Sequence, residues 1–334
     1  MNRTLLLLCL ILGINAISRG ETPPAKGVKS INRLTAEAHV EFLAQDELLG
    51  REAGSPGARV AGHYIVSVLK SLGISPLGNS YYHPFVACHA ERQKVGRRWQ
   101  VHPDSIRQLQ KEVHQRLDLN NIFGVIEGRN PDEIVIIGAH YDHLGHDVLL
   151  AGDQIYNGAD DNASGVSAVL QIARAFLATG RQPERTVIFA FWDGEEKGLL
   201  GSRAFTATFP RVGDVKAYLN FDMIGRNTDE SRPRHVVYFY TESHPLFEQW
   251  LREDIREYGL RLEPEYRPWD KPVGGSDNAP FALRNIPIIW YHTNGHPDYH
   301  QPGDHADKIN WEKLVDITRA AFLNMWHLAN DKTF

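Results

Sequence analysis

The chain has 334 residues, of which 42% are hydrophobic and 23% are charged, as in an ordinary globular protein with a large core. Its formal net charge of -5 provides no excess of basic residues, which argues against nucleic acid as a partner. Only Cys9 and Cys88 are cysteines, and Cys9 lies in a segment that we expect to be removed. The mature chain should therefore contain no internal disulfide.

Residues 1–20 have the pattern of a secretory signal peptide. Arg3 gives a positive start, and residues 4–14 form an apolar run that is too short to span a bilayer. Small residues favour cleavage after Ala16, Ser18 or Gly20, and an uncleaved anchor is the alternative. We predict an exported protein, periplasmic or secreted, with no membrane association after cleavage.

The rest of the chain alternates short apolar runs with segments of helical periodicity. Residues 21–29 carry proline and glycine and are expected to form a loose lead-in, and the charged, mostly helical pattern at 89–116 is expected to be an exposed insertion without a role in chemistry. Helices are predicted at 35–44, 59–72, 163–178, 246–258 and 311–328, and strands at 121–126, 134–139, 186–192, 217–221, 235–240 and 286–292.

Several predicted strands are continuous apolar runs, which is typical of strands buried on both faces of a sheet. The pattern predicts an α/β fold, a three-layer α/β/α sandwich with a mostly parallel mixed central sheet. Candidate site residues extend from His140 to His300 without a low-complexity linker between them. We therefore expect residues 21–334 to form a single catalytic domain.

Three clusters of acidic and histidine residues follow apolar runs or open a helical pattern. In α/β proteins such positions, at the carboxyl ends of strands, usually carry the chemistry. The clusters are Gly138-Ala-His-Tyr-Asp-His-Leu-Gly145, Gly158-Ala-Asp-Asp-Asn-Ala-Ser-Gly165 and Phe191-Trp-Asp-Gly-Glu-Glu-Lys-Gly198. Together they predict one metal site.

Histidine nitrogens and carboxylate oxygens are zinc ligands, and two adjacent metal ions need a shared carboxylate because the ions repel each other. Asp161, the second acid of its turn, is the natural bridge. His140 and Asp142 are spaced so that one can bind metal while the other, a carboxylate, accepts the remaining imidazole N–H. Of the adjacent Glu195 and Glu196, one can bind metal and the other can act as a general base, although a Glu-Glu pair alone is more often a solvated turn.

Five motifs in the same order make the chain resemble the co-catalytic di-zinc aminopeptidases. This family includes secreted bacterial leucyl aminopeptidases and is related to glutaminyl cyclases. The resemblance covers nearly the whole mature chain from the Gly50-Arg-Glu-Ala-Gly54 turn onwards. The motifs are His140-Tyr-Asp142, Gly158-Ala-Asp-Asp-Asn-Ala-Ser-Gly165, Asp193-Gly-Glu-Glu196, Asn220-Phe-Asp-Met223 and Asp298-Tyr-His300.

The resemblance implies two zinc ions per chain, each with its own pair of ligands. It places His140 and Asp222 on one zinc and Glu196 and His300 on the other, with Asp161 bridging both.

The resemblance also implies roles for residues beside the metals. It makes Glu195 the general base, Tyr299 a group that helps to hold the oxyanion, and the Asp161–Asn162 peptide bond cis. The chain departs from the family at Asn278, where a histidine is common. Five further histidines lie near the motifs and are expected to have loop or hydrogen-bonding roles, namely His143, His146, His292, His296 and His305.

The function implied is a zinc-dependent aminopeptidase that hydrolyses N-terminal residues of peptides with a metal-activated bridging water. Its partners would be peptides with a free N-terminus. Alternatives are a glutaminyl-cyclase-like acyltransferase, a carboxypeptidase or another zinc amidohydrolase, and a catalytically silent binding domain is disfavoured because every ligand is present. The oligomeric state and the preferred side chain stay open, although Trp269, Trp290 and Tyr291 could line an apolar pocket.

Overall fold

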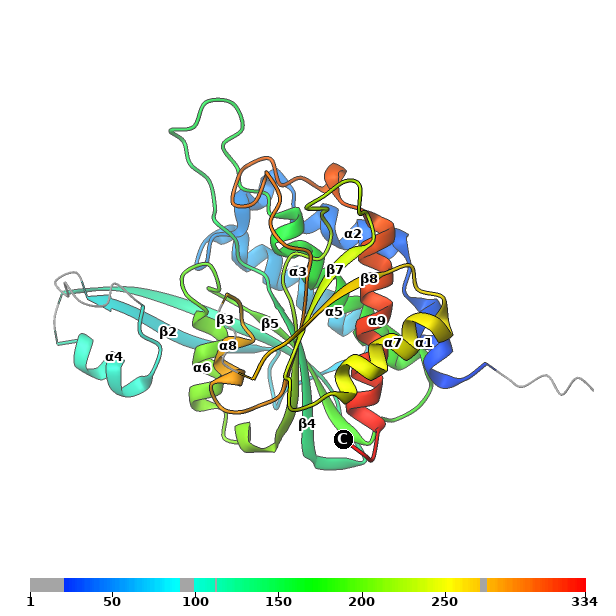
Figure 1. Cartoon of the computed structure of the whole chain (residues 1–334). Helices are drawn as coiled ribbons and strands as arrows, with labels where there is room; N and C mark the ends of the chain where they lie inside the picture. Colours follow the sequence, from blue (N-terminus) through cyan, green and yellow to red (C-terminus); the bar gives the residue numbers. More distant parts are fainter. Residues whose placement is uncertain (1–20, 91–98, 112, 271–274) are drawn as a thin grey trace, which may run out of the picture.

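The computed structural model describes residues 21–334 except 91–98, 112 and 271–274. The predicted signal peptide therefore lies outside the described residues. Within the described part, nine strands form one mixed sheet with helices on both faces (Figure 1). The strands are β1 (Ser75–Pro76), β2 (Tyr82–Ala90), β3 (His114–Ile126), β4 (Asn130–His140), β5 (Arg185–Trp192), β6 (Val215–Phe221), β7 (His235–Tyr240), β8 (Glu263–Pro268) and β9 (Ile288–His292).

The helices follow the predicted alternation with the strands. They are α1 (Pro23–Ser30), α2 (Arg33–Leu43), α3 (Pro56–Leu72), α4 (Pro103–Leu109), α5 (Gly165–Ala178), α6 (Leu200–Thr208), α7 (Leu246–Tyr258), α8 (Ala279–Ala282) and α9 (Trp311–Asn330). Sequence signals set the ends of α3: Ser55 caps its first turn, Pro56 starts it, and Gly73 ends it with a left-handed φ of 76°.

The centre of the sheet is parallel and its margins are mostly antiparallel. The order is β1-β3-β5-β4-β6-β9-β7-β8, with β2 beside β3. Strands β5, β4, β6 and β9 run parallel to their neighbours within this group, whereas β3 and β7 join it antiparallel. The predicted α/β fold with a mixed central sheet is confirmed. Because the central strands run the same way, their carboxyl ends meet at one edge.

The continuous apolar runs are explained by burial of both faces of the sheet. In β4, Val135 and Ile137 belong to the core beneath α2, α3, α5 and α9, while Ile134 and Ile136 belong to a second core beneath α6 and α8. Figure 1 shows α6 and α8 on one side of the sheet and α5 and α9 on the other. Since successive side chains of a strand point to opposite faces, both sets must be apolar.

Two of the predicted segments differ in the structure. The expected lead-in contains α1, which packs against α5 and α9. The expected insertion at 89–116 starts inside β2 and ends inside β3, and among its described residues only Pro103–Leu109 form an α-helix. The β2–β3 hairpin projects from the sheet because β3 pairs with β5 only from Ile122 onwards (Figure 1). In the described part of the chain, no helix is both long and apolar enough to cross a membrane.

Candidate metal centre

The predicted site residues lie at the carboxyl edge of the parallel strands. His140 is the last residue of β4, Asp222 directly follows β6, and Glu195 and Glu196 lie shortly after β5. His300 comes from the segment after β9, and Asp161 lies in the helical turn Ala159–Ser164 that leads into α5. The sheet topology therefore brings together residues that are far apart in the sequence.

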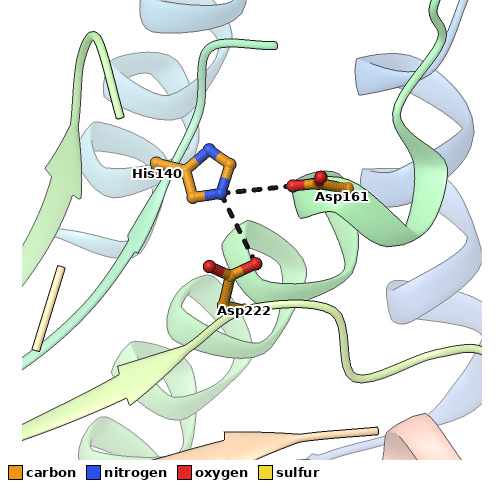
Figure 2. A group of neighbouring side chains, drawn as sticks. All are labelled: His140, Asp161 and Asp222. Carbon is orange, nitrogen blue, oxygen red and sulfur yellow. Dashed lines mark ion pairs between the residues drawn. The ribbon is translucent and has the colours of Figure 1, made fainter. Parts of the chain in front are cut away.

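One side of the site is formed by His140, Asp161 and Asp222, which Figure 2 shows pointing toward one another. The Nε2 atom of His140 lies 3.3 Å from Oδ1 of Asp161 and 3.6 Å from Oδ1 of Asp222. All three side chains are buried or nearly so.

The other side uses the second oxygen of the same aspartate. The Nε2 atom of His300 lies 3.3 Å from Oδ2 of Asp161 and 3.3 Å from Oε2 of Glu196. Asp161 thus presents one oxygen to each side, with a histidine and a carboxylate completing each. His300 has a left-handed φ of 54°, so its segment adopts a local backbone conformation that is uncommon outside glycine.

These separations fit metal ligation better than hydrogen bonding. Two ligands, each bound at about 2.0 Å to a tetrahedral zinc, lie about 3.3 Å apart. Nitrogen–oxygen hydrogen bonds are shorter, at about 2.7–3.2 Å. The buried Nε2 of His140 has no hydrogen-bond partner among the described residues, which is costly unless something else binds it. The donor set therefore fits zinc, and His140, Asp161 and Asp222 form one of three residue groups able to hold a metal ion in the described part.

The electrostatics distinguish Asp161, the predicted bridging acid, from Glu195, the predicted base. Burial alone would raise the pKa of Asp161, but the imidazoles of His140, His143 and His300 hold it well below its ordinary value. Burial raises the pKa of the Glu195 carboxyl well above its ordinary value, and nearby carboxylates add to the rise. Asp161 is therefore suited to remain an ionised ligand, and Glu195 to exchange a proton.

The carboxylate of Asp142 has a different main partner from the one predicted. It lies 3.8 Å from Nδ1 of His140, while the backbone carbonyl of Asp142 lies closer to that atom, at 3.2 Å. The carboxylate instead accepts backbone N–H groups of Glu195 at 3.0 Å and Glu196 at 3.4 Å. Asp142 therefore fixes the turn that carries both glutamates, and its carbonyl orients the imidazole.

The turn carrying Asp161 is held by side chains from distant segments. The carboxylate of Asp304 accepts the backbone N–H groups of Asp160 and Asp161, and Asn162 donates to the carbonyl of Phe221 at 2.9 Å, next to Asp222. The Asp161–Asn162 peptide bond is cis, as the resemblance implied. Asp304 was not predicted to belong to the site.

Glu195 and Tyr299 line an open cleft of about 550 Å³ beside the metal ligands. Its volume lies in the range of small-ligand sites, about 300–1,000 Å³. Tyr299 is 45% exposed and its ring lies against that of His300. Trp290 also lines the cleft, whereas Tyr291 is fully buried in the core.

Comparison with known proteins places the chain in a family. The model of peptidase family M28 matches residues 121–325, which include every predicted zinc ligand and Glu195. The chain belongs to peptidase family M28. The resemblance deduced from the motifs is thereby confirmed.

The M28 relatives differ in their described activities. Over 170 residues the chain is 32% identical to leupeptin-inactivating enzyme 1 of Streptomyces exfoliatus, a match that covers 50% of this chain and 34% of that protein. A glutamate carboxypeptidase 2 homolog of Caenorhabditis elegans is 30% identical over 209 residues, covering 54% of this chain and 25% of the relative. The chain thus matches only about a quarter to a third of the length of these relatives.

Solved structures share the M28 fold at lower identity. The LapA aminopeptidase of Legionella pneumophila superposes with a TM-score of 0.67 at 21% identity, over 91% of this chain and 74% of the other. The glutaminyl cyclase of Macrostomum lignano gives 0.65 at 20% identity, over 93% of each chain. These similarities show the fold.

Arg51 is a buried residue of this M28 centre whose role the sequence did not reveal. It lies in the Gly50-Arg-Glu-Ala-Gly54 turn, where Leu49, Gly50 and Arg51 all have left-handed φ angles of 46°, 67° and 49°. A Cβ atom at Gly50 would lie 2.0 Å from the carbonyl oxygen of Gly145, so only glycine fits there. This unusual backbone directs Arg51 beneath the metal-site loops.

The guanidinium of Arg51 donates to four backbone carbonyls, three of which lie in the segments that carry His140 and Asp161. Nε donates a hydrogen bond to the backbone carbonyl of Tyr141 at 3.0 Å, and the Nη atoms donate to the carbonyls of Leu43, Asn157 and Gly158. Burial lowers its pKa to about 10, against the carboxylates of Asp161 and Asp142 that raise it, so the group stays charged at neutral pH.

Replacing Arg51 with methionine is expected to lower the free energy of unfolding by at least about 3 kcal/mol, because several buried carbonyls lose a charged donor. Thermal and denaturant unfolding would measure this. The matched control is Arg59→Met, because Arg59 is exposed on α3. This substitution should lower the free energy of unfolding by less than about 0.5 kcal/mol. Equal effects of the two substitutions would contradict the role of Arg51.

Proposed function

We propose that this M28 protein is an aminopeptidase that binds two zinc ions per chain and removes N-terminal residues from peptides. The observation that carries the proposal is the position of Asp161, whose two oxygens each face a histidine and a second carboxylate. His140 and Asp222 would hold one ion, Glu196 and His300 the other, and Asp161 both.

Zinc at such a centre supplies Lewis acidity, which lowers the pKa of water and polarises a carbonyl group. In the proposed reaction, Glu195 accepts a proton from the attacking water and delivers it to the leaving amine, acting first as base and then as acid. Tyr299 lines the same cleft, and its hydroxyl would donate a hydrogen bond to the substrate oxygen as negative charge develops on it.

The side chains that line the described part of the cleft disfavour binding of the carboxyl end of a peptide. Its lining includes four carboxylate side chains, and its described residues include no lysine or arginine. A carboxypeptidase needs a cation to bind the terminal carboxylate of its substrate, usually an arginine. The apolar side chains of Leu199, Met223 and Trp290 in the same cleft suit an apolar first residue.

The proposal includes export of the protein. The support is the signal-peptide pattern of residues 1–20, with the mature chain beginning near residue 21. N-terminal sequencing of the protein recovered outside the cytoplasm would identify the cleavage site, and an intact N-terminus would contradict cleavage.

The function is tested with a panel of aminoacyl anilides, N-acetylated peptides, peptides differing at the C-terminus and a peptide with N-terminal glutamine. We expect cleavage of free aminoacyl anilides, loss of activity with a chelator, and two zinc ions per chain by elemental analysis. Cleavage of blocked peptides from the C-terminus would support a carboxypeptidase. One zinc ion with cyclisation of N-terminal glutamine would support a cyclase.

A further inference from the structure

We infer that His143 is a positioning residue for the metal centre: it fixes the Glu196 carboxylate through a hydrogen bond and so strengthens binding of the ion on the His300 side. The inference rests on the proposed function, since it assumes that Glu196 binds metal. His143 was expected to have only a loop or hydrogen-bonding role.

The contact between the two side chains is short and buried. Nδ1 of His143 lies 2.7 Å from Oε1 of Glu196, and the histidine is 1% exposed. An ionised carboxylate can only accept, so Nδ1 must carry the proton and donate. The other ring nitrogen, Nε2, is buried without a hydrogen-bond partner among the described residues. A phenylalanine would avoid that cost, so packing alone does not explain a histidine here.

The fold makes room for this ring and anchors its backbone. A Cβ atom on Gly158, which has a φ of 60°, would lie 2.6 Å from Cδ2 of His143, so the glycine allows the ring to approach the turn that carries Asp161. The backbone N–H of His143 donates to the carbonyl of Arg51 at 3.1 Å. The position of the ring is therefore fixed from two directions.

The geometry favours a hydrogen-bond donor over a metal ligand. The 2.7 Å separation from Glu196 is a hydrogen-bond length and is shorter than the about 3.3 Å expected between two ligands of a tetrahedral ion. Nδ1 also lies 4.0 Å from Oδ2 of Asp161, which is longer than that distance. With Oε1 bound to His143, Glu196 directs Oε2 toward His300, at 3.3 Å.

Fixing the carboxylate in advance should matter for affinity. A free glutamate side chain loses rotational freedom when it binds an ion, and a neighbouring donor that already orders it removes part of this cost. Loss of partners that orient metal ligands typically weakens metal affinity by about 10- to 100-fold.

The test compares His143→Phe with His143→Asn in the full mature protein. Phenylalanine keeps a ring but removes the donor, whereas the asparagine side-chain N–H₂ can occupy nearly the position of Nδ1. The matched control is His146→Phe on the same loop, where the side chain is exposed. Zinc affinities of both sites are measured by competition with a chromophoric chelator at fixed pH, and thermal unfolding of the metal-free variants checks folding.

We expect His143→Phe to lower the affinity for one of the two zinc ions by about 10- to 100-fold. His143→Asn should restore most of that affinity, and His146→Phe should match the unsubstituted protein. The cobalt(II)-substituted protein should show altered absorption bands in His143→Phe only. Full affinity in His143→Phe would overturn the inference, and so would an equal loss in both His143 variants. If the unsubstituted protein itself failed to bind two ions, the proposed function would fail instead.

Discussion

Glu195→Gln is expected to lower kcat by about 10²- to 10⁴-fold, the usual contribution of a general acid-base group, while both zinc ions stay bound. The amide has nearly the same shape as the carboxylate but cannot accept a proton from water. Glu195 lines the cleft, and burial raises its pKa well above the ordinary value, as expected for a group that must take up and release a proton.

Steady-state kinetics and elemental analysis of the same preparation test this prediction. Glu253→Gln on the exposed side of α7 is a suitable control and should leave both quantities unchanged. Turnover close to normal would exclude Glu195 as the base. Loss of one zinc ion would instead make Glu195 a ligand, an alternative that its proximity to His140 and Glu196 keeps open.

Asp161→Asn should have the second large effect. We expect this variant to lose both zinc ions and all measurable activity. The neutral side chain offers one carbonyl oxygen in place of two charged ones, so it cannot serve both sides of the site. The neighbouring imidazoles hold the pKa of Asp161 well below its ordinary value, so the wild-type group is fully ionised at neutral pH.

Asp222→Asn provides the comparison for this variant. Asp222 contacts only the His140 side of the site. Its substitution should therefore weaken binding of mainly one ion, and the other should stay bound at close to one per chain. Zinc content after dialysis against limiting chelator would separate the two results. An Asp161→Asn protein that keeps two ions would refute the shared position of Asp161.

The strongly patterned elements of the fold could be predicted from the sequence. The bounds of β7 and α7 are as predicted, because an apolar strand and an amphipathic helix each have a local periodicity. Strand β8 was missed: its sequence, Glu263–Pro268, contains glutamates and prolines, and its described pairing is to β7 alone. In such a strand, tertiary pairing overrides local propensity.

Helix α1 was missed for a related reason. Its prolines lie at the first helical positions, where they are tolerated, and its glycine fits beneath the ring of Phe322, which a Cβ atom would approach to 2.2 Å. Neither feature is apparent from the composition, which favours a loop.

Within the site, the residues predicted to bind zinc come together, because their motifs lie at the ends of the central strands, at the start of α5 or in the segment after β9. The supporting residues were harder to find. Arg51 and Asp304 act through backbone carbonyl and N–H groups, and these contacts leave no spacing pattern in the sequence. His143 was visible as a residue, but its contact with Glu196 depends on how two loops meet.

The division of the Asp161 carboxylate between two sides has a thermodynamic consequence. In the proposed two-zinc centre, an ion on the His140 side would fix the rotation of the shared carboxylate, so it would change the free energy with which a second ion binds on the His300 side. Pre-orientation favours the second ion and repulsion between like charges opposes it. If the proposed centre binds two ions, their occupancies would therefore be coupled, and the zinc dependence of activity would differ from that of two independent sites.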